Sequence, residues 1–180
     1  MEFWTSGASL TKNRKLPQHL EPAYAGVVEA AKTAEDLGFD GVLSAEHHFM
    51  YDAFMPQPLQ ALAAAAAATD SIRLLTGAML LPLYDPLEAA EQAITIDILS
   101  EGRVTVGLGM GYRPLEFNTF GTAKRTRGAR LVEGMEVLRL ATSQETFSYS
   151  GKHYQYENVS LLPRPVQQPI YMSFCGGATP

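Results

Sequence analysis

The feature that most constrains the fold of this chain is a regular alternation of apolar runs with helical patterns. Five short, mainly apolar runs are typical of strands, at residues 2–7, 41–45, 72–80, 102–111 and 169–177. Helical patterns at 21–37, 56–69, 86–99 and 124–142 fall between successive runs. Strands separated by about one helix each pair in parallel, because the crossover returns every strand in the same direction. The pattern therefore predicts an α/β fold whose parallel sheet is covered by helices.

Local signals support these boundaries. Pro22 and Pro86 suit the first turn of a helix, and Gly38 suits a helix end. Residues 145–157 alternate around a Ser-Gly pair, which predicts a β-hairpin. The crowding of alanines at 61–68 predicts a helix packed closely on the sheet. Two architectures fit this order, a doubly wound open sheet and a (β/α)8 barrel, and both bind ligands at the carboxyl ends of their strands.

Composition excludes several classes of function. With 180 residues, 46% hydrophobic and 18% charged, the chain has the size and balance of one globular domain. A net charge of -5 argues against nucleic acid or an anionic membrane as the main partner. No apolar run reaches the ~18 residues of a membrane span, and the start lacks the order of a signal peptide. A single cysteine, Cys175, rules out an intramolecular disulfide, so we expect a cytoplasmic location.

The end of the second predicted strand carries the sequence Glu46-His47-His48-Phe49. Successive side chains on a strand point to opposite faces, so the two histidines are not expected to act together. This alternation disfavours a metal site. One histidine can point into a site at the strand end, while a buried, hydrogen-bonded structural histidine is the alternative.

Glycines mark the ends of the third and fourth predicted strands. Gly77 indicates a bulge or the close approach of a ligand to the main chain, and close helix-to-sheet packing is the alternative. The glycines at 107, 109 and 111 do not form a G-x-G-x-x-G fingerprint, because Tyr112 stands where the third glycine is needed. A Rossmann site is therefore disfavoured, although a flat ligand or a phosphate could approach the main chain here.

The remaining polar candidates are weaker. Arg113 can pair with a phosphate or lie in solvent, and a Gly176-Gly177 turn can bind an anion. Glu133 and Glu136 are expected on a solvated helix face, and Cys175 is expected to pack inertly in the fifth strand.

Blocks of sequence between residues 22 and 177 resemble, in order and spacing, the bacterial luciferase-like flavin-dependent monooxygenase family. They include AEDLGFDGVLSAEHHF, the SEGR at 100–103, and YSGKHYQYENVSLLPRPVQQPIYMSFCGG. The resemblance implies a (β/α)8 TIM barrel with its flavin at the carboxyl ends of the strands. Here it would be an incomplete barrel of about five strands, a domain of residues 1–180 truncated after strand five. Leu74–Leu75 and residues 104–108 are then expected to line the exposed barrel interior.

The resemblance also implies roles for individual residues. His47 matches the catalytic histidine that handles a proton at the cofactor or substrate. A non-prolyl cis peptide is implied at Gly77–Ala78, beneath the flavin ring, and Gly176 and Gly177 match the phosphate-binding turn. Met110 stands where the luciferase has an arginine that binds the flavin phosphate, and Arg113 is a candidate substitute.

The expected function is a monooxygenase that uses reduced FMN and O2 on a small organic substrate. A separate flavin reductase would supply the reduced flavin, the protein is expected to be a homo-oligomer, and the residues Phe49, Phe54 and Met55 are candidate apolar walls. The missing arginine leaves a deazaflavin coenzyme with hydride transfer as an alternative. A non-catalytic flavin-binding remnant is another, and a metal-dependent hydrolase is disfavoured because too few ligands converge.

Overall fold

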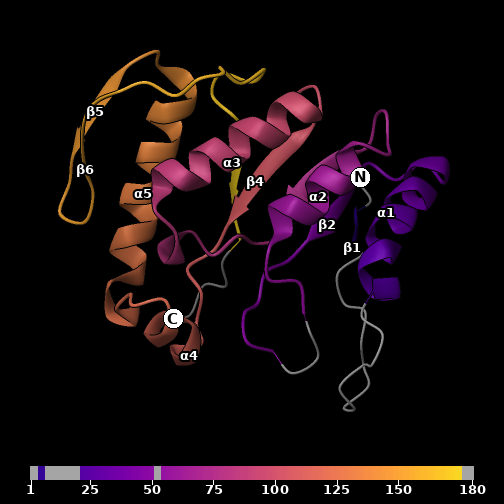
Figure 1. The fold of residues 1–180 in the computed structure, drawn as a ribbon, viewed down its shortest axis with the longest axis horizontal. Coiled ribbons are helices and arrows are strands. Elements are labelled where there is room, and N and C mark those ends of the chain that lie inside the picture. Colours follow the sequence, from indigo (N-terminus) through magenta and orange to yellow (C-terminus); the bar gives the residue numbers. More distant parts are fainter. Residues whose placement is uncertain (1–3, 7–20, 51–53, 176–180) are drawn as a thin grey trace.

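The structure is a computed structural model that describes residues 4–6, 21–50 and 54–175. Its centre is a five-stranded parallel sheet in the order β1-β2-β3-β4-β7 (Figure 1). The strands are β1 (Trp4–Ser6), β2 (Gly41–Ser44), β3 (Arg73–Thr76), β4 (Val104–Leu108) and β7 (Met172–Phe174). The spatial order follows the order along the chain, as in a barrel, whereas a doubly wound sheet reverses its order at a switch point. The prediction of an incomplete barrel is therefore confirmed, and the doubly wound alternative is wrong.

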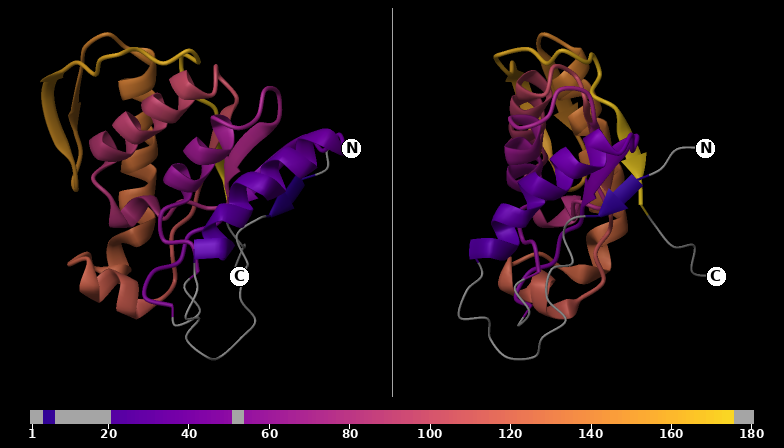
Figure 2. Two further views of the ribbon diagram at one scale, coloured as in Figure 1. Left: turned by 45° about the vertical axis from the view of Figure 1, so that its right-hand side comes forward. Right: turned by 90° about the vertical axis from the view of Figure 1, so that its right-hand side faces the viewer.

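Helices connect the strands along one face of this sheet. The α-helices are α1 (Glu21–Asp36), α2 (Pro58–Ala66), α3 (Pro86–Leu99), α4 (Pro114–Thr119) and α5 (Arg127–Ser143), and two short 3-10 helices are η1 (Leu81–Leu83) and η2 (Lys124–Thr126). The four predicted helices are confirmed, two of them with ends shifted by a few residues. In Figure 2, α1, α2 and α3 lie on the same side of the sheet. Within the described ranges, no helix has the length and apolar character needed to cross a membrane.

The core lies between the strands and these helices. Alternate strand residues, including Val42, Leu74 and Val106, are buried in one cluster with alanines of α2 and α3. The paired register Val42↔Leu74 and Leu74↔Val104 places these side chains in a row. Of the alanines crowded at 61–68, Ala65 and Ala66 are buried, whereas Ala64 and Ala67 are exposed, so the predicted close packing holds for one side of this segment only.

The opposite face of the sheet is the one that a complete barrel would enclose. Leu43, Leu75 and Thr105 lie on this face and are only partly buried. The expectation that Leu74 and the whole of 104–108 line the barrel interior is thus wrong. Strand alternation turns Leu74, Val104, Val106 and Leu108 toward the helices, where each is at most 1% exposed.

The predicted hairpin forms strands β5 (Phe147–Ser150) and β6 (Gln155–Val159), which pair antiparallel and contact α5. Glu133 of α5 accepts the backbone N–H groups of Lys152, His153 and Tyr154 at the hairpin turn. Desolvation raises the pKa of Glu133, but these N–H groups outweigh it and hold the pKa below its ordinary value. The expectation of a merely solvated Glu133 is therefore wrong, whereas Glu136 does pair with Arg139 on an exposed face.

Two charged side chains fix the amino-terminal end of the sheet. Glu35, near the end of α1, accepts the backbone N–H groups of residues 70–72. Arg103, in the SEGR segment, donates to four carbonyl oxygens and to the Thr69 hydroxyl. Charge-assisted hydrogen bonds thus hold the amino-terminal end of the sheet. The candidate site lies at the opposite, carboxyl-terminal end.

Candidate active site

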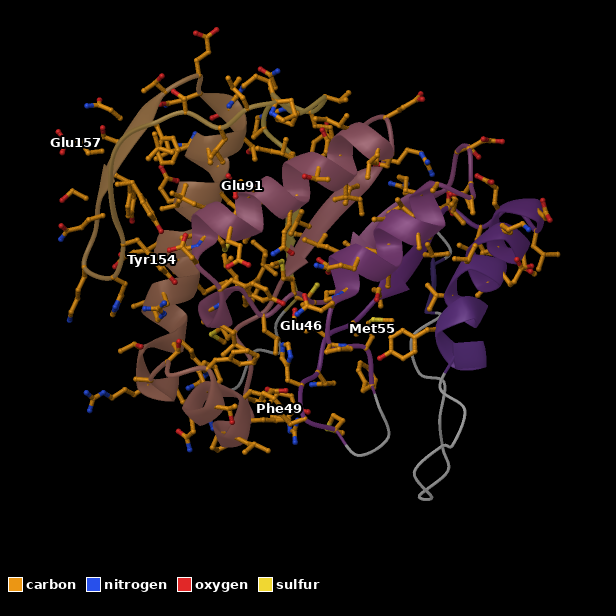
Figure 3. The ribbon with its side chains drawn as sticks, in the orientation of Figure 1. Glu46, Phe49, Met55, Glu91, Tyr154 and Glu157 are labelled. Atoms are coloured by element: carbon orange, nitrogen blue, oxygen red, sulfur yellow. The ribbon has the colours of Figure 1, made fainter. Side chains whose placement is uncertain are left out.

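The candidate site lies at the carboxyl ends of β2, β3 and β4. Residues 45–49 leave β2, residues 77–80 leave β3, and residues 109–113 lead from β4 into α4. In Figure 3, Glu46 lies at these strand ends near the middle of the molecule, and Phe49 lies further out beside α4. The carboxyl ends of parallel strands meet at one edge of the sheet, so three segments distant in sequence converge here.

A floor of main chain joins the three strand ends. The Gly77 N–H donates to the Ser44 carbonyl at 2.8 Å, and the Met79 N–H donates to the Gly107 carbonyl at 2.8 Å. The Gly109 N–H donates in turn to the Met79 carbonyl at 2.8 Å. The Gly77–Ala78 peptide within this segment is cis, as the family resemblance implied. Residues 77–79 are therefore held on both sides by neighbouring main chain.

The glycines of this floor are required by the approach of neighbouring atoms. A Cβ atom at position 107 would lie 1.9 Å from the Thr76 carbonyl oxygen, and one at 109 would lie 3.0 Å from the Ala78 Cβ. A Cβ at Gly77 would lie 2.3 Å from Leu43 Cδ1. The close neighbour of Gly77 is thus a side chain of the adjacent strand and not a helix, and the approach of a ligand to Gly77 stays a prediction. Gly77 and Ala78 are only partly buried beside the strand ends, whereas Gly107 and Gly109 are buried beneath them.

His47 follows β2 at the same end of the sheet, and its ring contacts two aromatic neighbours. Its N–H donates to the Met55 carbonyl at 3.0 Å, and 24% of its side chain is exposed. The ring meets Phe54 edge-on at a centroid distance of 4.9 Å and Tyr112 at 5.8 Å. Its Nδ1 atom is buried and has no hydrogen-bond partner in the described structure. The geometry suits a group that holds or moves a proton, and the catalytic role of His47 remains a prediction.

His48 points elsewhere, as strand alternation predicted. Its Nε2 atom lies 2.7 Å from Oε1 of Glu46, and both side chains are buried. The second carboxyl oxygen of Glu46 accepts the Leu80 N–H at 3.1 Å, so Glu46 ties the end of β2 to the segment after β3. Burial raises the pKa of Glu46, and the bonds from His48 and Leu80 offset this only in part. The nearby Tyr84 hydroxyl also has a raised pKa, because of burial and the adjacent Glu46.

Glu116 of α4 is the second buried carboxylate of the site. Its Oε1 atom accepts the His48 N–H at 3.1 Å and lies 3.3 Å from Arg113 Nη1. The same guanidinium nitrogen donates to the His48 carbonyl oxygen. Arg113 therefore braces the His48 main chain and Glu116, and this pairing argues against Arg113 as a substitute phosphate ligand.

The other predicted positions have mixed outcomes. Met110 is half-buried and packs against the core, with Sδ 3.9 Å from a Cβ built on Gly128 of α5. Gly176 and Gly177 lie outside the described residues. Cys175 is exposed, so the expectation of an inert packed cysteine is wrong; strand β7 already ends at Phe174.

The three candidate wall residues also differ in their surroundings. Phe54 packs against the His47 ring. Met55 is buried with Val27 in a small cluster that Phe54 and Ala61 pack against, and its carbonyl accepts the His47 N–H. Phe49 is 50% exposed and lies near Phe120, with ring centroids 5.5 Å apart. Of the three, Phe54 is the one that borders the histidine.

Sequence reasoning missed Glu46 and Glu116 as parts of the site. A charged residue directly after an apolar strand was the available signal for Glu46. Glu116 gave no comparable signal, because its helix was not predicted and its partner His48 is 68 residues away.

The chain is thus an incomplete (β/α) barrel with a histidine and two buried carboxylates at the carboxyl end of its sheet. Comparison with known proteins identifies its family. Residues 4–178 match the family model of luciferase-like monooxygenases, and the chain belongs to this family. It is 28% identical over 148 residues to the oxygenase component of the flavin-dependent trigonelline monooxygenase of Acinetobacter baylyi, covering 81% of this chain and 41% of that protein.

Two solved structures show the same fold. Monooxygenase RslO1 from Streptomyces bottropensis superposes with a TM-score of 0.89 at 32% identity, over 97% of this chain and 53% of RslO1. An F420-dependent secondary alcohol dehydrogenase superposes with a TM-score of 0.75 at 22% identity, over 96% of this chain and 51% of that one, and shares the fold alone. The chain thus spans about half the length of the relatives that it matches.

Proposed function

We propose that the protein is a flavin-dependent monooxygenase that uses reduced FMN and O2 to oxygenate a small organic substrate. The observation that carries this proposal is that His47 follows β2 at the same, carboxyl end of the sheet where the main chain at 77–79 and 107–109 joins β3 and β4. Family membership supports the reaction class. The flavin dependence of the trigonelline relative supports the cofactor.

The floor fits a flat ring better than a bulky ligand. Gly77 and Ala78 are only partly buried and together carry one methyl group, so a planar group could rest on them. Gly77 and Ala78 would support the ring, and Gly176 and Gly177 would hold the phosphate. Met110 would lie near the cofactor without pairing with its charge. When bound, reduced FMN supplies the electrons that activate O2.

The chain's own residues would manage protons and water. His47 would act as general acid or base, because its ring is partly exposed while its backbone and ring edges are fixed. Phe54 and Tyr112 cover two edges of the imidazole and would exclude water from that side. A dry surrounding strengthens every electrostatic contact within the site.

A deazaflavin-dependent hydride transfer is the second candidate. Met110 favours it, since no cation stands at the position that binds the flavin phosphate in the luciferase. The fold shared with an F420-dependent dehydrogenase is compatible with it. In both candidates we propose that the protein is a cytoplasmic homo-oligomer. In the first, a separate reductase supplies the flavin, in keeping with a relative named as an oxygenase component.

Anaerobic titration with reduced FMN, followed by oxygen-uptake measurements with a panel of aldehydes, ketones and sulfonates, tests the proposal. We expect saturable binding and substrate-dependent oxygen consumption. His47→Ala should keep binding within about threefold and lower turnover by about 10²- to 10⁴-fold. The control His153→Ala changes a histidine of the hairpin turn and should leave both unchanged.

Other results of these measurements would count against the monooxygenase or favour one of the alternative functions. Binding of reduced FMN without oxygen consumption above the rate of free reduced FMN would count against the monooxygenase. Substrate-dependent reduction of a deazaflavin would establish the second candidate. Flavin binding with identical turnover in wild type and His47→Ala would leave a flavin-binding remnant.

A further inference from the structure

Two buried polar atoms of the site lack hydrogen-bond partners in the described part of the chain, and they belong to neighbouring side chains. They are Nδ1 of His47 and Oε2 of Glu116. Nδ1 lies 3.6 Å from the other oxygen of the same carboxylate, Oε1. This distance is slightly beyond a hydrogen bond. Buried polar atoms are rarely left unsatisfied, so an unsatisfied Nδ1 this close to a carboxylate with a spare oxygen needs an explanation.

The contacts of Glu116 restrict what it can accept. Its Oε1 atom already accepts the His48 N–H, and the Arg113 guanidinium lies beside it. An ionised carboxylate has several acceptor sites and no donor, so Nδ1 of His47 must carry the proton in any hydrogen bond between the two groups. The Arg113 guanidinium, 3.3 Å from Oε1, is a cation paired with this fully buried carboxyl group.

The surroundings of His47 leave one ring nitrogen for the reaction. Nδ1 is buried, so the exposed 24% of the side chain belongs to other atoms of the residue. Phe54 and Tyr112 restrict the tilt of the ring, and the backbone bond to Met55 fixes its base. A proton held on Nδ1 makes Nε2 the nitrogen that accepts or delivers a proton.

We propose that Glu116 is the positioning residue of His47: its carboxylate holds the proton on Nδ1 and so presents an unprotonated Nε2 to the site. This role rests on the proposed function of His47. The same logic operates wherever a carboxylate fixes the tautomer of a catalytic imidazole. Glu116 does not touch the reacting atoms, and its effect passes through His47.

The competing explanation is that Glu116 is purely structural. In that case it would serve only the His48 N–H and the Arg113 cation. Its removal would then lower stability, and the tautomer of His47 would not change. The two explanations differ in a spectroscopic signature that requires neither cofactor nor substrate.

Imidazole 15N chemical shifts of the whole chain, labelled at histidine, report the tautomer. His47→Gln assigns the signals by their loss. We expect the Nδ1–H tautomer for neutral His47 in the wild type. In Glu116→Gln the ratio of Nδ1–H to Nε2–H should fall about tenfold, since a bond to a charged acceptor is replaced by one to a neutral amide. Glu116→Asp, which retracts the charge by one methylene group, should give an intermediate ratio.

Glu133→Gln is the matched control, because it neutralises a carboxylate that binds the hairpin turn and does not contact His47. Its tautomer ratio should equal that of the wild type. An Nε2–H tautomer in the wild type would overturn the proposal, as would a ratio unchanged in Glu116→Gln. Should Glu116→Gln fail to fold, an unchanged ratio in Glu116→Asp would overturn it.

Kinetics separate this role from the proposed function. We expect Glu116→Gln to lower turnover about 10- to 100-fold, with the dissociation constant of reduced FMN within about twofold of wild type. A chain that binds no reduced FMN and consumes no oxygen would refute the proposed function. A tautomer that still depended on Glu116 would then show that the positioning contact exists independently.

Discussion

Replacing Gly107 by alanine should destabilise the protein more than any other single methyl addition to the floor of the site. The new Cβ would lie 1.9 Å from the Thr76 carbonyl oxygen, whereas ordinary contacts begin at 3.4 Å. The obstructing atom is main chain of the adjacent strand, so no side-chain rotation relieves the overlap. β3 and β4 would have to separate at the point where the Gly107 carbonyl accepts from Met79 N–H and from the Thr76 hydroxyl.

The magnitude follows from these contacts. Two weakened hydrogen bonds cost about 1 kcal/mol each, and forced overpacking adds about 1–3 kcal/mol. We therefore expect the free energy of unfolding to fall by about 3–5 kcal/mol, a large part of the ~5–15 kcal/mol typical of a domain.

Urea unfolding followed by circular dichroism measures this loss. The matched control is Gly26→Ala in α1, where a new Cβ meets nothing within 4 Å. Alanine is the better helix former, so this control should gain about 0.5–1 kcal/mol. If Gly107→Ala unfolded at the same urea concentration as the wild type, with the same slope, the packing argument would be refuted.

Two further predictions concern the amino-terminal end of the sheet. Desolvation raises the pKa of Glu35, but the N–H groups of residues 70–72 and the Ser71 hydroxyl outweigh it and lower the pKa to about 2. Its contribution is therefore complete above the unfolded value near 4.5 and is lost as the pH falls from there toward 2. Glu35→Gln should lower the free energy of unfolding by about 1–2 kcal/mol at neutral pH. When the urea midpoint is plotted against pH, the variant should lose less stability than the wild type as the pH falls below 4.5. Parallel plots for variant and wild type would contradict this. Arg103→Lys should cost about 2–4 kcal/mol in thermal or urea unfolding, because one ammonium group cannot reach the five acceptors of the guanidinium. The exposed Arg139→Lys is its control, and equal losses in the two variants would refute the argument.

Much of the fold was predictable because the signals are local. The helix that begins at Pro86 was predicted with its observed bounds, since the proline, the apolar spacing and the following Ser-Glu-Gly turn all agree. The short helix α4 was missed because six residues after Pro114 are too few to show a period. The fifth strand was predicted at 169–177 and pairs only over Met172–Phe174, beside β4.

The site was predictable only in part, for a physical reason. Strand alternation and the strand-end rule placed His47 and separated it from His48. The partners of these residues lie far along the chain, as in the bond from Leu80 to Glu46 and the bond from His48 to Glu116. Arg113 illustrates the limit of prediction from sequence position. Its position suggested a phosphate ligand, but in the structure its guanidinium pairs with Glu116.

The two buried carboxylates explain how this half-barrel forms the surroundings of His47. Burying a carboxylate costs free energy unless its hydrogen bonds are made. The stability of the fold alone therefore does not explain why Glu46 and Glu116 are buried. Glu46 joins the end of β2 to the segment after β3, and Glu116 joins the same end of β2 to the helix after β4. These two bonds connect the carboxyl ends of β2, β3 and β4 to one another near His47, and every residue that makes them lies within 46–116. If the 180-residue chain binds cofactor poorly, the cause should therefore be sought in its phosphate and substrate contacts, while the tautomer of His47 should still respond to Glu116.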